Sequence, residues 1–208
     1  MALVAGSTKG IGRATAELLA KEGAAVAVNG RDSRNAAHVA AEIAAATGAR
    51  TVGIGADVST ADGVDELLSR TRESLGEADI LVTNAGGPRP GGFDDLSDAD
   101  FADGFNLNFL STVRMIRGAV PHMRSQRWGW ITNIQSTAIK EPVPLVTLTN
   151  SIRTGLTGLA KDLAGHLGPD QITVNTILSG PVMTDRLRTT MAARSPRPLM
   201  LAQPTMVQ

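Results

Sequence analysis

Short runs of apolar residues alternate along the chain with longer segments in which apolar side chains recur every three or four positions. The short runs are typical of buried strands, and the longer spacing is typical of amphipathic helices. Their alternation predicts strand-helix-strand units, which build a parallel sheet rather than a meander or a helix bundle. We expect strands at residues 2–5, 25–29, 51–55, 80–83, 130–134 and 172–178.

Two of the predicted helices carry an apolar stripe that we expect to face the sheet. The stripe of the first helix comprises Ile11, Ala14, Leu18 and Leu19. The stripe of the third helix comprises Val64, Leu67, Leu68 and Leu75. The chain also has 22 glycines and only 3% aromatic residues, which indicates that small side chains let the helices pack closely on the sheet.

Polar residues and glycines mark the ends of the helices. Ser59 with Asp62, and Ser97 with Asp100, have the form of capping boxes, which supply acceptors for the N–H groups of a first turn. Helices are expected to stop at Gly23, Gly48, Gly76 and Gly168. Because no repeat and no Ser/Gly-rich linker interrupts this pattern, we expect one domain at 1–194, followed by an atypical tail at 195–208.

Composition excludes several classes of partner. The 208 residues include 20 Lys+Arg and 20 Asp+Glu, a net charge of +0, so the basic footprint of a nucleic-acid binder is missing. No stretch approaches the roughly 18 uninterrupted apolar residues of a membrane span. Without a recognisable leader or any cysteine, we expect a cytoplasmic location and no metal site. The absence of tyrosine excludes any mechanism that needs a phenol.

A glycine-rich loop follows the first strand and opens the first helix. It reads GSTKGIG and contains Gly6, Gly10 and Gly12, with Ser7, Lys9 and Ile11 between them. Glycine lets backbone N–H groups approach a pyrophosphate, and the positive end of the helix dipole favours the anion. The alternative is a simple tight turn. The position between strand and helix, about 20 residues before the end of a second strand, favours a dinucleotide site.

The end of the second strand bears on the choice of cofactor. It reads Asn29, Gly30, Arg31 and offers no carboxylate for a ribose 2′-hydroxyl. Arg31 and Lys9 would neutralise a 2′-phosphate instead, so NADP(H) is preferred over NAD(H); the alternative is a pair of solvated cations. Asp57 and Val58 follow the third strand, and the Asp57 carboxylate either accepts from an adenine amino group or caps the next turn.

From residue 2 to about 187 the chain resembles the short-chain dehydrogenase/reductase family, particularly its ketoacyl-reductase-like members. Further markers are the Asn84, Ala85, Gly86 turn, Asn108 followed by Pro121, Ser136 at the end of a strand, and Gly180 with Thr184. The resemblance implies an α/β fold with a Rossmann-type doubly wound parallel sheet in three layers. It also implies hydride transfer between a nicotinamide cofactor and a carbonyl or alcohol, and a homodimer or homotetramer formed through helices near 100–126 and 149–167.

Four residues carry the chemistry of that family: asparagine, serine, tyrosine and lysine. Asn108 matches the asparagine, which holds a water in the proton relay, and Ser136 matches the serine, which hydrogen-bonds the substrate oxygen. The family spacing puts the tyrosine and lysine at positions that here hold Thr149 and Arg153. An aliphatic hydroxyl is a far poorer acid than a phenol of pKa about 10, and a guanidinium keeps its proton. Arg153 is therefore expected to hold the cofactor ribose rather than to move a proton.

Another group must then supply the proton. Lys140, in the loop beyond Ser136, would serve as the acid if it were desolvated there, although a surface lysine is the simpler interpretation. His122, beside Pro121, is more simply a packed or solvated histidine. The loops at 88–96, 140–148 and from 185 onward predict a small-molecule substrate that is partly apolar.

The remaining departures from the family are local or terminal. Ala5, Thr83 and Ser179 replace a threonine, an asparagine and a proline, and each is expected to loosen a local hydrogen bond or turn. The family continues through a seventh strand and helix that residues 188–208 do not resemble, so we expect a C-terminally shortened fold. The sixth strand would then be an exposed sheet edge.

Three functions follow from these observations. The first is an NADP(H)-dependent, 3-oxoacyl-reductase-like oxidoreductase with a non-standard proton donor. The second is a non-redox lyase, isomerase or cyclase on the same scaffold, whose hydrophobic substrate is shaped by the apolar loop Pro142 to Leu148. The third is a nucleotide-binding protein without catalysis.

Overall fold

A computed structural model describes residues 1–185, 187 and 188 of the chain. The predicted tail at 195–208 and the end of the predicted domain lie outside the described residues. Six strands form one parallel sheet in the order β3-β2-β1-β4-β5-β6. Their bounds are β1 (Ala2–Val4), β2 (Val26–Gly30), β3 (Thr51–Gly55), β4 (Ile80–Thr83), β5 (Gly129–Ser136) and β6 (Ile172–Ser179).

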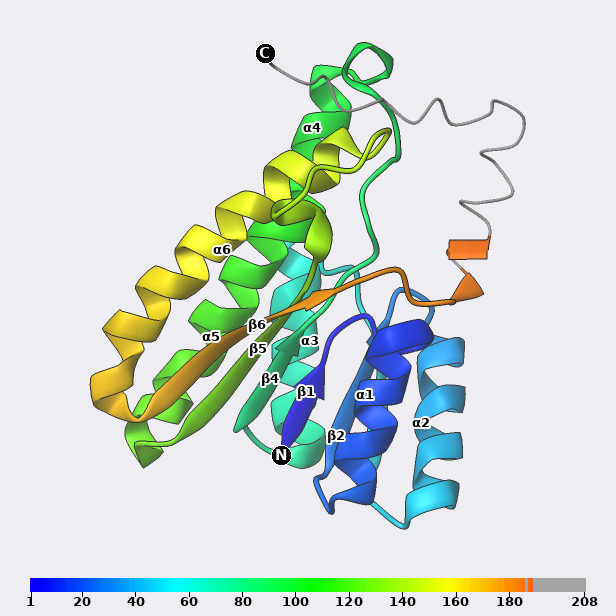
Figure 1. Ribbon diagram of the computed structural model, residues 1–208. Coiled ribbons are helices and arrows are strands. Elements are labelled where there is room, and N and C mark those ends of the chain that lie inside the picture. The colour runs from blue at the N-terminus through cyan, green and yellow to red at the C-terminus, as the bar shows by residue number, and fades with distance from the viewer. Residues whose placement is uncertain (186, 189–208) are drawn as a thin grey trace.

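Helices cover both faces of this sheet, so the predicted three-layer, doubly wound α/β fold is confirmed (Figure 1). One face carries α1 (Gly10–Lys21) and α2 (Ser33–Thr47). The other carries α3 (Ala61–Leu75), α5 (Ser111–Gln126) and α6 (Thr147–Leu167). Helix α4 (Asp98–Phe105) continues through a π-helical turn, Asn106–Leu110, directly into α5. All six predicted strands are present; β5 ends at Ser136, as the resemblance implied, two residues beyond the end at 134 that the apolar pattern predicted.

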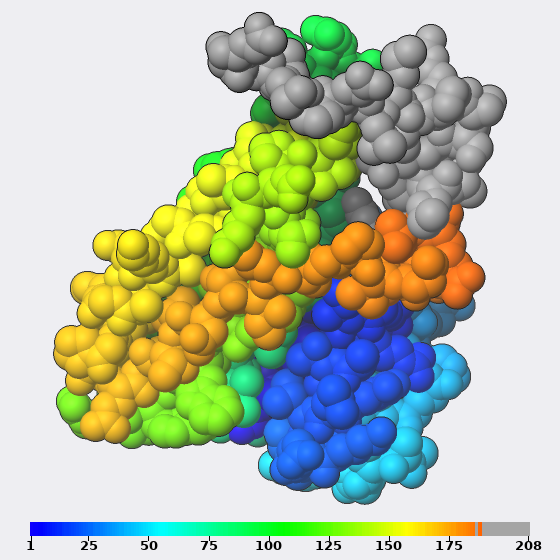
Figure 2. Space-filling view, in the orientation of Figure 1, coloured from blue at the N-terminus to red at the C-terminus, as the bar shows by residue number. Residues whose placement is uncertain are grey.

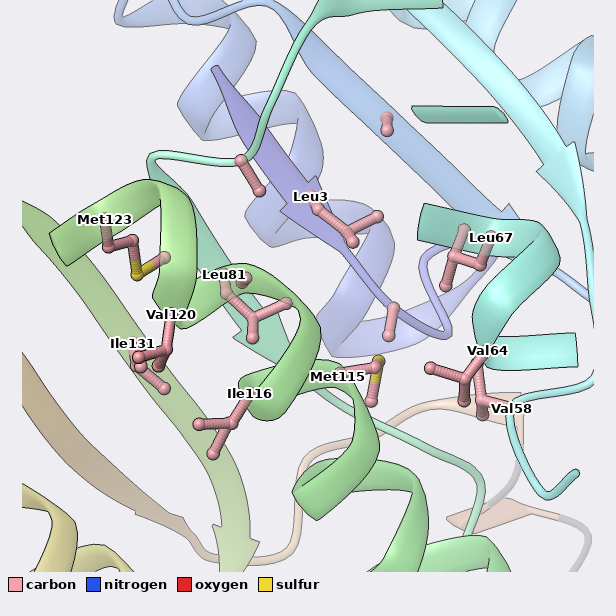
Figure 3. Close-up of a cluster of buried hydrophobic side chains, with 14 of the residues drawn as sticks. Leu3, Val58, Val64, Leu67, Leu81, Met115, Ile116, Val120, Met123 and Ile131 are labelled. Atoms are coloured by element: carbon pink, nitrogen blue, oxygen red, sulfur yellow. The ribbon is translucent and has the colours of Figure 1, made fainter. Parts of the chain in front are cut away.

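The larger core lies between the sheet and the α3/α5 face (Figure 3). Leu3, Leu81 and Ile131 stand on neighbouring strands and point to the same face, because side chains alternate along a strand. Leu67 of α3 and Met115 of α5 pack against them, and all five side chains are fully buried. Each burial contributes about 1.5–3 kcal/mol, so this layer is a major source of stability.

The first helix packs on the sheet differently from the prediction. It buries Gly12, Ala16 and Ala20, whereas Leu18 of the predicted stripe is 60% exposed and Ala14 is also exposed. Ile11 and Leu19 of that stripe are half-buried. Small residues four positions apart let the helix backbone come close to the sheet, and this turns the larger side chains outward. The predicted stripe is therefore half right: Ile11 and Leu19 pack against the core, whereas Ala14 and Leu18 face solvent.

Helix ends follow the prediction in part. Ser97 and Asp100 form the predicted capping box of α4. The cap of α3 is Thr60 and not Ser59, because the Thr60 hydroxyl accepts from the Gly63 N–H at 3.0 Å. Gly48 ends α2 in the left-handed region with φ 73°. Gly168 is the C-cap of α6, as predicted, but it keeps right-handed helical angles, and a left-handed residue follows only at Gln171, with φ 61°.

Strand β6 is the last strand of the described sheet, and the predicted C-terminal shortening depends on residues beyond 188, which lie outside the described residues. On the face shared with α1, Thr173, Asn175 and Ile177 are exposed, and Figure 2 shows β6 at the surface there. The β6 end of the sheet therefore has a free edge and a free face among residues 1–185, 187 and 188.

No described helix is both long and apolar enough to cross a membrane.

A polar cluster closes the opposite, amino end of the sheet. Asp79, just before β4, accepts hydrogen bonds from the Met1 amino group and from Gln126 Nε2, the latter at 2.8 Å. His122 Nε2 lies 2.9 Å from the same carboxylate, so this histidine has a structural partner, in line with the simpler interpretation. Burial opposes ionisation of Asp79, but the hydrogen bonds from Met1, His122 and Gln126 outweigh it and hold the carboxyl pKa below its ordinary value.

The lowered pKa predicts a pH-dependent stability. Since the folded-state pKa lies below the unfolded value, Asp79 stabilises the fold above the unfolded pKa, and that contribution is lost as pH falls through the folded pKa. Asp79→Asn should lower the melting temperature at pH 7 by about 2–4 °C, the equivalent of about 1 kcal/mol for an exposed pair. Circular-dichroism melts should show the difference shrinking near about pH 3. An equal difference at both pH values would contradict the assignment.

Candidate functional site

The glycine loop requires glycine at each of its three positions. Gly6 and Gly10 have φ values of 56° and 59°, in the left-handed region that side chains rarely adopt. A Cβ on Gly12 would lie 2.4 Å from the Gly6 carbonyl oxygen and 2.7 Å from Asn84 Nδ2. The start of α1 is thus pressed against the loop that leaves β1, at the carboxyl end of the sheet.

The N-terminus of α1 has no side-chain cap. Its N-cap residue is Lys9, which is exposed and makes no capping hydrogen bond. By contrast, Asp32, Thr60 and Ser97 cap α2, α3 and α4. Among the described residues, no side chain accepts from the first-turn N–H groups of α1, and the helix dipole makes this end favourable for an anion.

Asn29, at the end of β2, fixes the glycine loop by hydrogen bonding, a role that the sequence did not predict. Its side chain is buried, accepts from the Gly6 N–H at 3.1 Å and donates to the carbonyls of Ile54 and Ala56 at 3.3 and 3.2 Å. The Ser7 hydroxyl accepts from the Asn29 N–H and donates to the Val4 carbonyl, so it is used inside the fold. The sequence feature that could have indicated this role is a polar residue at the end of an otherwise apolar strand, because a buried polar side chain needs hydrogen-bond partners.

Of the predicted cofactor residues near β2 and β3, one is exposed and two have contacts inside the fold. Arg31 is exposed, and the next carboxylate, that of Asp32, caps α2 by accepting from the Asn35 N–H at 2.8 Å. Asp57 accepts from the Ser59 N–H at 3.0 Å, so the turn-capping alternative is present. Val58 is buried beside Val64 in the larger core (Figure 3).

The turn after β4 is held from both sides. Asn84 Nδ2 donates to the carbonyls of Gly6 and Ala5 at 3.0 and 3.3 Å. Asn108 Nδ2 donates to the Gly86 carbonyl at 2.9 Å, so the turn through Ala85 joins the glycine loop to the helix layer. Asn108 lies in the π-helical turn, and its buried Oδ1 has no hydrogen-bond partner among the described residues. π-Helical turns often mark functional positions, and this oxygen can accept from a ligand or a water.

The replacement at Thr83 does not loosen the sheet as expected. Its hydroxyl donates to Asn133 Oδ1 at 2.7 Å, and both side chains are buried. Thr83 and Asn133 stand opposite each other in the β4-β5 register, so this hydrogen bond links the two strands at the position where the family has an asparagine. The Ser179 hydroxyl likewise finds a partner, the Gln135 carbonyl at 3.1 Å.

The structure brings the candidate chemical groups to the carboxyl end of β5. Ser136 ends the strand; its oxygen accepts from the Ala138 N–H at 3.2 Å, which leaves its hydroxyl proton to donate. Thr149 is half-buried in the first turn of α6. Lys140 follows the short 3₁₀ turn Thr137–Ile139 and is exposed, so the desolvated lysine considered from the sequence is not present among the described residues.

Arg153, which stands where the family lysine was expected, is buried between α6 and β5. Its Nη1 donates to the Ile134 carbonyl at 3.2 Å and to Gln135 Oε1 at 3.3 Å. These bonds place its guanidinium beside the residue that precedes Ser136. The sequence alone indicated neither of these partners, because each lies 18 or 19 positions from Arg153 along the chain.

The chain beyond β6 returns to the glycine loop. A Cβ on Gly10 would lie 3.3 Å from Thr184 Cγ2, so Thr184 lies against the glycine loop. Gly180, between β6 and Thr184, is exposed. In Figure 1 this segment crosses above α1. A hollow of about 440 Å³ lies between the two, lined by Gly10, Ile11, Ala14, Thr15, Leu18, Val182, Met183, Thr184 and Asp185.

The two loops predicted to line a substrate pocket are joined by backbone hydrogen bonds. The Gly91 N–H donates to the Leu145 carbonyl at 2.9 Å, and the Thr147 N–H donates to the Gly91 carbonyl at 3.2 Å. Leu145 adopts φ 63°, a strained conformation for a branched side chain, which the sequence did not indicate. Phe93, Val143 and Leu145 are exposed, so the rim of these loops is apolar, as predicted.

The chain is similar in sequence and in structure to known oxidoreductases. Residues 1–195 match the family described as "short chain dehydrogenase". The uncharacterized oxidoreductase YvrD of Bacillus subtilis is 35% identical over 186 residues, 89% of this chain and 69% of that protein. The 3-oxoacyl-[acyl-carrier-protein] reductase FabG of Aquifex aeolicus is 33% identical over 186 residues, 89% and 75% of the two chains. The structure of L-sorbose reductase from Gluconobacter frateurii, complexed with NADPH and L-sorbose, has 33% identity and a TM-score of 0.87, covering 91% of this chain and 72% of that one.

The close approach at Gly12 predicts a position-specific loss of stability. Gly12→Ala should lower the free energy of unfolding by about 1–3 kcal/mol, because the added Cβ overpacks the loop. The matched control is Gly165→Ala in α6, where a Cβ meets no atom within 4 Å. This control should raise stability by about 0.5–1 kcal/mol. Urea unfolding measures both, and a Gly12→Ala chain as stable as its parent would contradict the packing described.

Proposed function

The chain belongs to the short chain dehydrogenase family, and from this premise we propose that it is an NADP(H)-dependent oxidoreductase that interconverts a carbonyl and an alcohol. The observation that carries the proposal is the cradle at the start of α1, where Gly12 admits no Cβ and the helix N-terminus has no side-chain cap. A pyrophosphate fits such a cradle because it accepts from exposed N–H groups.

Specific residues of this chain would hold the dinucleotide. The backbone from Gly6 to Gly12 would face its pyrophosphate, and Arg31 with Lys9 would neutralise a 2′-phosphate, which favours NADP(H) over NAD(H). The remaining contacts that we propose lie at the adenine end and along the groove: Asp57, Val58, Asn84, Ala85, Gly86, Arg153, Gly180 and Thr184. Two similar structures support the cofactor: L-sorbose reductase is complexed with NADPH, and YwfH, which is 26% identical to this chain, is an NADPH-dependent reductase.

Bound NADPH would supply the hydride that reduces a carbonyl carbon. For the rest of the reaction we look to the carboxyl end of β5, where Ser136 has a hydroxyl proton to donate to the substrate oxygen. The positive charge of Arg153 beside the preceding residue would stabilise negative charge as it develops on that oxygen. Asn108, with its unpartnered buried oxygen, would hold a water at this end of the sheet.

The proton for the developing alkoxide has a non-standard source in this proposal. The whole sequence contains no tyrosine, and the hydroxyl of Thr149 is too weak an acid to replace a phenol. Lys140 is exposed four residues after Ser136 and in contact with solvent. We therefore propose that water, in exchange with solvent near Lys140, delivers the proton, and that catalysis is slower than with a phenol.

The substrate that we propose is a partly apolar carbonyl compound. Phe93, Val143 and Leu145 supply exposed apolar surface on the two joined loops. One curated relative is named a 3-oxoacyl-[acyl-carrier-protein] reductase, which supports a 3-oxoacyl-like substrate. Neither nucleic acid nor a membrane has a role in this proposal.

We also propose that the chain forms a homodimer or homotetramer through α5 and α6. A groove of about 420 Å³ runs between these helices. Its lining includes the apolar side chains of Val113, Ile116, Leu159 and Leu163, together with Arg117 and Arg124. A second copy that packs its own helices into this groove would bury these side chains. The cytoplasmic location and the domain boundary at 194 stay predictions.

Turnover distinguishes this function from the two alternatives. The parent chain, supplied with NADPH and a panel of 3-oxoacyl thioesters, ketoses and aldehydes, should oxidise NADPH slowly. Ser136→Ala should lower kcat about a hundredfold, because it removes a donor to the reacting oxygen. The control Ser151→Ala removes a hydroxyl that bonds only within α6, to the Thr147 and Leu148 carbonyls, and should leave kcat unchanged.

The double change Thr149→Tyr with Arg153→Lys should raise kcat by about a hundredfold, since it installs a phenol beside an ammonium. Activity of the double variant with none in the parent would instead indicate a catalytically silent nucleotide-binding protein. Conversion of a substrate without oxidation of NADPH would indicate a lyase, isomerase or cyclase. Either result contradicts the proposed oxidoreductase.

A further inference from the structure

Strand β6 lies at an edge of the sheet and has none of the features that often stop an edge strand from pairing. It is eight residues long and reads ITVNTILS, with no charged residue and no proline. Protected edges are instead short, bulged, or marked by charged residues or proline. β6 pairs in unbroken register with β5, and in the part of the chain that the structure describes no strand pairs with its outer side. Its outer N–H and C=O groups can therefore receive another strand.

The side chains on the open face of β6 form a polar middle between two apolar rows. Thr173, Asn175 and Ile177 are exposed there, and Figure 2 shows this strand at the surface. Asn175 stands in the middle, opposite Thr132 of β5, although asparagine is depleted in strands. Trp130 stands opposite Thr173 and is 52% exposed, and Ile177 is 53% exposed. The polar middle row therefore has an apolar side chain on each side of it.

This pattern is self-complementary when two β6 strands run antiparallel across a two-fold axis at Asn175. Asn175 then stands opposite Asn175 of the other copy, and each amide can both donate to and accept from the other. Thr173 stands opposite Ile177 of the other copy, so that isoleucine and Trp130 flank Thr173 on one face. A register shifted by two residues would instead place Asn175 opposite Ile177. The polar residue in the middle of the strand thus selects one register.

Charge and symmetry favour a second copy as the occupant of this edge. Because β6 has no charged residue, no like charges oppose each other across the axis. Pairing across a two-fold axis uses the edges of both copies, so this contact closes at two chains and does not continue into a fibre. On the other face, the half-buried Val174 would stand opposite Thr176 of the other copy. Both are β-branched residues, which pack well on a pleated surface.

We propose that β6 is an interface between two copies of this chain, whose β6 strands pair antiparallel about Asn175 and join two six-stranded sheets into one continuous sheet. This interface is separate from the groove between α5 and α6. Two copies joined by each interface would give a tetramer. The inference goes beyond the proposed function and depends on neither the cofactor nor the reaction.

Single cysteines test the register, because the chain contains no cysteine of its own. Asn175→Cys places two thiols opposite each other, with Cβ atoms about 5 Å apart, so mild oxidation of the full chain should give a covalent dimer. Thr173→Cys and Ile177→Cys should each stay unlinked, because their identical positions lie about 14 Å apart across the axis. A mixture of these two variants should cross-link. Thr173→Cys that cross-links as fast as Asn175→Cys would overturn the proposal, and so would Asn175→Cys that does not cross-link.

Sedimentation equilibrium tests the interface without cysteines. Asn175→Lys opposes two positive charges at the axis and should raise the dissociation constant of this contact about tenfold. The matched variant Asn175→Thr is neutral and allows a cross-strand hydrogen bond, so it should change that constant by no more than about twofold. Because residue 175 is exposed, both variants should fold, which circular-dichroism melts check. Equal dissociation constants for the two variants would overturn the proposal.

Hydrogen exchange of the β6 amides distinguishes a second copy from any other occupant. Protection of these amides should rise with protein concentration, because the partner strand comes from another molecule. Protection that is the same at low and high concentration would indicate that a segment of the same chain pairs with the edge, and this would overturn the proposal. None of these measurements uses a dinucleotide or a substrate, so the interface and the proposed function are decided separately.

Discussion

The site depends on how closely α1 approaches the loop that leaves β1. Gly12 faces the Gly6 carbonyl oxygen at a distance that admits no Cβ, and the same carbonyl accepts from Asn84. This contact joins three segments, β1, α1 and the turn after β4, at one point. Because α1 is held there by small residues, its uncapped N-terminus opens directly at the carboxyl end of the sheet. A larger residue at Gly12 would move the helix and with it every group that could face a phosphate.

Polar side chains inside the fold are concentrated around this end. Asn29, Thr83, Asn108, Asn133 and Gln135 are all buried there, while the middle of the sheet is aliphatic (Figure 3). Buried polar groups are costly unless each finds a partner. Asn29 and Asn108 bond to backbone carbonyls of other strands or loops, whereas Thr83 bonds to Asn133 and Gln135 accepts from Arg153. The network therefore holds the loops in place around the groove. The unpartnered oxygen of Asn108 is the exception, and it lies where the proposed water would bind.

The sequence predicted those features that depend on local pattern. Strands are apolar runs between turn residues, and all six were found close to their predicted bounds, because the strands inside a parallel sheet are buried on both faces. Gly6, Gly10 and Gly12 were identifiable because backbone geometry forces glycine there. Thr184 was named only as a marker of the family resemblance, and its contact with Gly10 was not predicted.

Features that depend on distant partners were missed. Leu18 has the right helical period but faces outward, because the depth of α1 is set by Gly12, Ala16 and Ala20 against the sheet. Asn29 bonds to β3 and the glycine loop, and Arg153 bonds to β5; nothing local to either residue names these partners. Thr60 rather than Ser59 caps α3 because the exact entry of the chain into the helix decides between adjacent hydroxyls.

Isothermal titration calorimetry of the full chain with NADPH and with NADH tests the central claim most directly, since the groove is claimed to accept a phosphorylated dinucleotide whatever the source of the proton. The account predicts saturable binding of NADPH that is tighter than that of NADH, because Arg31 and Lys9 favour the additional phosphate. Well-folded protein that gives no heat with either dinucleotide at millimolar concentration would contradict it.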